Sequence, residues 1–92
     1  MKKQERLIAK VEEFIQDKEK ELDVEEFLYT IEPSSKKVVE LRVDGLLYDI
    51  FNNMEEYIHN FAQDFLKEFE ILLENEADWD FVQSSVIELH IK

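Results

Sequence analysis

The stretch ENEADWDF, from Glu74 to Phe81, concentrates acidic side chains at alternate positions. Its carboxylates belong to Glu74, Glu76, Asp78 and Asp80. No basic residue follows them until Lys92. Such a group could hold a metal ion, exchange protons with a substrate or bind a basic surface. If the stretch is extended, alternate carboxylates lie on one side at intervals of roughly 6–7 Å and resemble a phosphate backbone.

The histidines do not indicate a metal site. Glu55 and His59 are spaced to share one side of a helix, but His90 is remote in sequence, and no HxxxH, HExxH or calcium-loop spacing occurs. The chain also lacks cysteine, which excludes thiolate ligands and disulfides. We expect no metal and no other cofactor.

Catalytic motifs are also missing. The pairs Ser34-Ser35 and Ser84-Ser85 lack the glycines of a nucleophile elbow, and the lone Gly45 cannot form a phosphate-binding loop. A domain this small has little room for a pocket that would perturb the pKa of a carboxylate. We expect a protein that is not an enzyme.

Charge is distributed unevenly along the 92 residues, whose net charge is −12. Residues 1–42 hold eleven acids and nine bases, a net charge of −2, whereas residues 43–92 hold twelve acids and two bases, a net charge of −10. This balance argues against direct binding of nucleic acid or of an anionic membrane. It favours a basic protein partner, although a dense run of charge is more often simply a solvated surface.

The apolar spacing predicts helices at both ends of a small sheet. Residues 3–21 form an amphipathic pattern, and a second, wider apolar stripe runs from Met54 to Leu73 after a capping signal at Asn53 and Glu56. An apolar helix of this kind must pack on a platform, and a sheet is the obvious one.

Three strands are predicted between these helices. Phe27, Tyr29 and Ile31 alternate along the first strand, and Val39, Leu41 and Val43 alternate along the second. Asp44-Gly45 is a strong hairpin signal, which would pair Val43 with Leu46 and make residues 46–50 the third strand of a meander.

The alternation in Val86–Ile91 predicts a closing strand, which a short helix at 78–83 could precede. A third helix over residues 78–90 is the alternative. The expected fold is therefore a single α+β domain over residues 1–92, two-layered, with the order α-β-β-β-α-β. In this arrangement an apolar set is left on the opposite side of the sheet, where the first helix either covers it or leaves it as a patch: Leu28, Val38, Leu47 and Phe51.

This layout resembles that of small acidic proteins with which phages block host defence, the anti-restriction and anti-CRISPR inhibitors that act as DNA mimics. The corresponding stretches are Leu7–Ile15, Phe27–Phe51 and Glu55–Asp80. The resemblance implies an inhibitor that fills the site where a nuclease reads duplex DNA, a Cas9-like type II-A effector being the leading example. The chain has no signal-peptide pattern or membrane-spanning stretch, so we expect a cytoplasmic protein in a bacterial host cell.

The charge pattern of the chain itself nominates the partner-binding residues, Glu70, Glu74, Glu76, Asp78 and Asp80, with Asp44, Asp49 and Asp64 at the periphery. Trp79 lies between two of these acids and is either an exposed anchor for Arg and Lys or a lid on the edge of the core.

Two other functions stay open. An immunity or antitoxin-like protein that caps a basic toxin would need the same charges. A structural subunit would instead associate with itself through Leu28, Leu47 and Phe51. The acid-driven functions predict a monomer or weak dimer whose binding is sensitive to salt.

Overall fold

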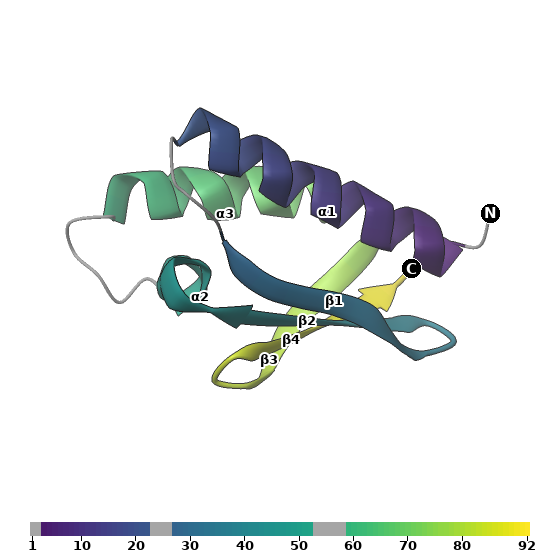
Figure 1. Ribbon diagram of the computed structural model, residues 1–92. Helices are drawn as coiled ribbons and strands as arrows, with labels where there is room; N and C mark the ends of the chain where they lie inside the picture. Colours follow the sequence, from purple (N-terminus) through teal and green to yellow (C-terminus); the bar gives the residue numbers. More distant parts are fainter. Residues whose placement is uncertain (1–2, 23–26, 53–58) are drawn as a thin grey trace.

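The computed structural model describes residues 3–22, 27–52 and 59–92 (Figure 1). The elements are α1 (Lys3–Glu21), β1 (Leu28–Ser35), β2 (Val38–Asp44), α2 (Gly45–Asn52), α3 (His59–Leu73), β3 (Ala77–Gln83) and β4 (Val86–Ile91). The strands form one antiparallel sheet in the order β1-β2-β4-β3. The predicted α+β class, with an N-terminal helix and an antiparallel sheet, is confirmed.

The two layers follow from alternation along the strands. In β2, Val39, Leu41 and Val43 are buried, whereas the residues between them are at least partly exposed. Helices α1 and α3 lie on the same side of the sheet, as Figure 1 shows. The opposite side of the sheet has no helix over it in the part of the chain that is described, and we call it the open face.

The helix α1 has the bounds that its apolar spacing predicts. Leu7, Val11 and Ile15 recur every four residues, and all three are buried. Gln4 anchors the start of the helix to the β1–β2 turn, because its amide donates to the backbone oxygens of Ser35 and Val38.

Aromatic side chains join the helices to the sheet. Phe65 and Phe69 of α3 are buried, with their ring centroids 5.1 and 5.8 Å from that of Phe14 on α1. Phe51 of α2 lies 5.2 Å from Phe69 and 5.7 Å from Trp79 of β3. These rings form the centre of one core shared by all three helices.

The predicted third strand at residues 46–50 is wrong, because this segment is the helix α2. Gly45 does have the positive φ that the hairpin signal implies, at +54°, but the chain turns there into a helix. The Asp44 carboxylate accepts a hydrogen bond from the Gly45 N–H at 2.8 Å. A strand would put Leu47 and Ile50 on opposite faces, whereas the helix brings both into the core.

The apolar set that the meander left on the far face is thereby redistributed. Leu47 and Phe51 are buried in the core, Val38 is half-buried, and Leu28 is exposed. The self-association surface predicted from Leu28, Leu47 and Phe51 is therefore absent from the described surface, because two of its three members lie inside the protein.

The C-terminal segment forms a hairpin of two strands. The closing strand Val86–Ile91 is confirmed as β4, whereas residues 77–83 are the strand β3 rather than a short helix, and the alternative helix over 78–90 is also wrong. Ala77, Trp79 and Phe81 alternate with Asp78 and Asp80, so this strand has the two-residue period of a one-sided sheet. The capping signal at Asn53 and Glu56 and the apolar positions 54–58 lie outside the described residues.

Two truncations test the helical assignment of α2. We expect Leu47→Ala to lower the free energy of unfolding by about 2–5 kcal/mol, because Leu47 is 0% exposed and its loss leaves a cavity. Leu28→Ala, at a side chain that is 53% exposed, should change it by no more than ~0.5 kcal/mol. Urea unfolding followed by circular dichroism measures both. Equal, small effects would restore the strand, in which both residues share the far face.

Candidate functional site

The predicted row of carboxylates along residues 74–80 does not form. Residues 74–76 are a turn, closed by a 2.9 Å hydrogen bond from the Glu76 N–H to the Leu73 carbonyl, so the extended backbone begins only at Ala77. Asp78 and Asp80 alone share one face of the strand. The interpretation of this stretch as a continuous ladder is therefore wrong.

Glu76 is committed to a structural contact. Its Oε1 lies 3.1 Å from the Lys10 Nζ. The hydrogen bond from Lys10 and the charges of Lys10, Arg6 and Lys3 lower the pKa of the Glu76 carboxyl. This acid therefore joins α1 to the turn before β3.

A different row of acids crosses the sheet from edge to edge on its open face. Glu32 of β1 pairs with Glu40 of β2, Glu40 pairs with Glu88 of β4, and Glu88 pairs with Asp80 of β3. Neighbouring strands are about 4.8 Å apart, so the four residues lie in register in one line across the sheet. We call Glu32, Glu40, Glu88 and Asp80 the acidic row.

The acidic row is only partly neutralised. Arg42 Nε lies 2.9 Å from Glu40 Oε1, and His90 Nε2 lies 3.2 Å from Glu88 Oε1, a contact that carries charge only when the imidazole is protonated. Like charges directly opposite each other destabilise a sheet. The open face therefore maintains an electrostatic repulsion that a surface with alternating signs would avoid.

Two further acids extend the charge of this face. Asp78 pairs with His90 across β3 and β4, and its carboxylate is 3.5 Å from the Lys92 ammonium. Asp44 lies at the end of β2, on the same side as Arg42. Both side chains are exposed.

The other predicted contact residues lie elsewhere. Glu70 and Glu74 line a hollow at the end of α3 together with Asp78 and Trp79, whereas Asp49 is half-buried on α2. The Trp79 ring is half-buried on the helix side of β3, 5.7 Å from both Phe51 and Phe69. Trp79 is thus the lid on the core edge, the second of the two alternatives.

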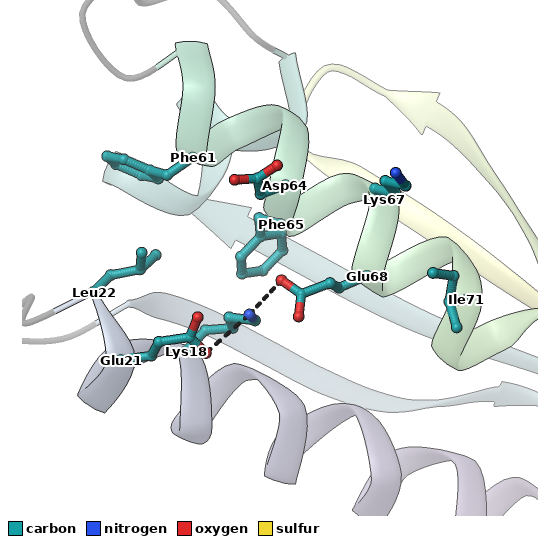
Figure 2. Close-up of a pocket in the computed structure, with 9 residues that line it drawn as sticks. All are labelled: Lys18, Glu21, Leu22, Phe61, Asp64, Phe65, Lys67, Glu68 and Ile71. Carbon is teal, nitrogen blue, oxygen red and sulfur yellow. Dashed lines mark hydrogen bonds and ion pairs between the residues drawn. The ribbon is translucent and has the colours of Figure 1, made fainter.

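Asp64 lines a groove of about 320 Å³ between the C-terminal turns of α1 and the face of α3, shown in Figure 2. The ammonium of Lys18, a residue that is 5% exposed, lies within it. It donates to the carboxylates of Glu21 and Glu68, the first at 3.0 Å, and is 5.7 Å from the centre of the Phe14 ring. The groove is therefore occupied by an ion triad that ties α1 to α3.

Of the acidic row, the predicted contact set contains only Asp80, and Glu88 is not singled out in it. Sequence reasoning missed Glu32 and Glu40, because both lie in the half of the chain whose charges nearly balance. Their alternation with apolar residues was available as a signal for which face they occupy. Their alignment with Glu88 and Asp80 depends on β4 lying between β2 and β3, and the sequence pattern does not contain that order.

No family model, curated protein or solved structure matches the chain. Within residues 3–22, 27–52 and 59–92, no three His, Asp or Glu side chains lie close enough together to hold a metal ion. None of the described helices is long and apolar enough to cross a membrane. The acidic row is the candidate site.

The Lys18 triad should make the free energy of unfolding depend on pH in the alkaline range. Burial acts to lower the pKa of Lys18, but the hydrogen bonds and charges of Glu68 and Glu21 outweigh it, so the pKa is raised. The triad should therefore stabilise the fold below the unfolded pKa, about 10.4, and this contribution should disappear as the pH rises through the folded pKa.

We expect the difference in free energy of unfolding between the wild type and Lys18→Met to stay constant up to about pH 10 and to shrink as the pH rises further, through the raised pKa of Lys18. Urea titrations at several pH values measure it. Lys20→Met, at an exposed lysine of the same helix, is the control and should show no such trend. A constant difference for Lys18→Met would contradict the triad's role.

The repulsion within the acidic row is also measurable. Glu32→Lys places an ammonium opposite Glu40 at the exposed edge of the sheet and should raise the free energy of unfolding by ~0.2–1 kcal/mol. The gain should decrease in 1 M salt, where the Debye length is only about 3 Å. Glu32→Gln should give a smaller gain. A loss of stability for Glu32→Lys at low salt would show that the row is not repulsive.

Proposed function

We propose that this protein is an acidic inhibitor without catalytic activity, whose open sheet face occupies the basic nucleic-acid groove of a partner protein. The observation that carries this proposal is the acidic row, four acidic residues in register across four strands. A groove built to bind phosphates presents Lys and Arg in a line, and such a surface would relieve the repulsion that the row maintains.

The resemblance to phage DNA mimics makes a host defence nuclease the proposed target, with a Cas9-like type II-A effector as the leading example. Inhibition would be competitive: the acidic face would exclude DNA from the groove by position and by charge. The proposal places the protein in the bacterial cytoplasm, as a monomer or weak dimer. A net charge of −12 supports fast, steered association with a basic protein.

The geometry changes the contact set that the sequence suggested. Asp78 and Asp80 remain in it, since both are exposed on the open face. Glu32, Glu40 and Glu88 join them through strand pairing. Glu76 leaves it, because its carboxylate is already bound to Lys10.

The test is a pull-down from bacterial lysate followed by binding to the recovered partner. The wild type should capture a basic nucleic-acid-binding protein that high salt releases and that DNA displaces. The triple variant Glu32→Lys/Asp80→Lys/Glu88→Lys should lose at least about tenfold in affinity. Circular dichroism would confirm that the variant is folded.

The matched control reverses three exposed acids of α1, Glu5, Glu13 and Asp17, and changes the net charge by the same amount. It should keep most of the affinity, because these side chains lie away from the open face. Equal losses in both variants would mean that only net charge matters, and full binding by the row variant would reject the proposal. Recovery of a toxin would favour the immunity function instead.

A further inference from the structure

The strand β3 is an edge of the sheet whose outer side is unpaired among the described residues. It pairs only with β4, and its register shifts between Phe81 and Gln83, so its regular part runs from Ala77 to Phe81. The other edge strand, β1, carries Pro33 and a register shift between Pro33 and Ser35. Proline and lysine are common devices that keep other strands from adding to an edge. From Ala77 to Gln83, β3 contains neither.

The hydrogen-bond pattern of β4 identifies the outward-facing groups of β3. The Ile91 N–H donates to the Lys37 carbonyl at 2.8 Å, on the β2 side, and the Lys92 N–H donates to the Glu76 carbonyl at 3.0 Å, on the β3 side. Because successive residues of a strand alternate in direction, His90 and Glu88 also point their backbone groups toward β3.

Asp78 and Asp80 are the pairing partners of His90 and Glu88, so their backbone groups point inward, toward β4. Those of Ala77, Trp79 and Phe81 consequently point outward. The outward N–H and C=O groups of these three alternate residues form a template for one more strand, either antiparallel or parallel.

The side chains beside this template select the kind of strand. On the open face, Asp78 and Asp80 would be neighbours of the added strand and favour Lys or Arg. On the helix side, the half-buried Trp79 and Phe81 would be neighbours and favour apolar residues. A strand in which basic and apolar residues alternate satisfies both sides.

We infer that the partner docks by adding such a basic strand to β3, which would continue the acidic row with a cation beside Asp80. This inference rests on the proposed function and specifies the geometry of its interface. A second copy of this chain fits poorly, because β3 paired with itself would bring Asp78 and Asp80 of each copy close together, between two molecules of charge −12.

The test compares two synthetic peptides of the length of β3, one alternating Lys with Val and the other alternating Lys with Pro. Both carry the same charge, but proline lacks the N–H that a ladder requires. Amide hydrogen exchange by NMR then reports strand addition residue by residue. With the Lys-Val peptide, the Trp79 and Phe81 amides should gain about tenfold or more in protection.

The internal controls come from the same spectra. The backbone amide of Asp80 already pairs with β4, so its protection should change little. The amide of Ile31 faces outward on β1 by the same alternation and should gain no protection. Asp78→Lys/Asp80→Lys should abolish the protection, whereas Glu13→Lys/Asp17→Lys, with the same change in charge, should retain it.

Other outcomes overturn the inference in distinguishable ways. If both peptides shift the resonances of the acidic row equally and neither protects Trp79, the open face binds basic ligands without strand addition, and the proposed function survives alone. If neither peptide binds, strand addition fails and the pull-down alone decides the proposed function. Protection of Trp79 that rises with protein concentration in the absence of peptide would identify a second copy as the occupant.

Discussion

The contact of Phe65 and Phe69 with the sheet and with the other helices organises the whole molecule. These two rings meet Phe14 from α1 and Phe51 from α2, and Phe69 also meets Trp79 from β3, so three helices and the sheet share a single apolar centre. All of this burial is on one side of the sheet. Among the described residues no helix packs on the other side, so its outward positions can carry acids.

The energies explain why such a face is tolerated. Each like-charged cross-strand pair costs roughly 0.2–1 kcal/mol, whereas full burial of a single large apolar side chain contributes about 1.5–3 kcal/mol. Arg42 offsets part of the repulsion at Glu40. The core therefore outweighs the acidic row, and the fold can hold a charge arrangement that is unfavourable until a cationic surface meets it.

Local periodicity predicted some of this structure and misassigned the rest for identifiable reasons. Leu7, Ile8 and Val11 share one face of a helix but not of a strand, and the alternation in Val86–Ile91 fits a strand. The segment from Leu46 to Phe51 satisfies both periods, and the positive φ of Gly45 is common to a hairpin and to the turn that begins α2. The turn signal at Asp44-Gly45 favours a strand there, whereas packing against α3 favours the helix.

The candidate site was less predictable than the fold, since it depends on contacts between distant segments. Asp78 and Asp80 can be nominated from the sequence of residues 74–80 alone. Glu32 belongs to the acidic row only because it pairs with Glu40 on another strand. Trp79 illustrates the same limit, because its acidic neighbours suggested exposure while its strand position turns it toward Phe51. Charge counted along a chain does not show which charges share a surface.

The position of β4 between β2 and β3 has a consequence for the synthesis of the chain. β2 and β3 do not pair with each other, so every strand contact between the two halves of the sheet passes through residues 86–91. While the ribosome is still making this segment, the hairpin of β1 and β2 has an open inner edge and β3 has no partner at all. The native sheet can therefore close only after these residues leave the exit tunnel and insert between β2 and β3.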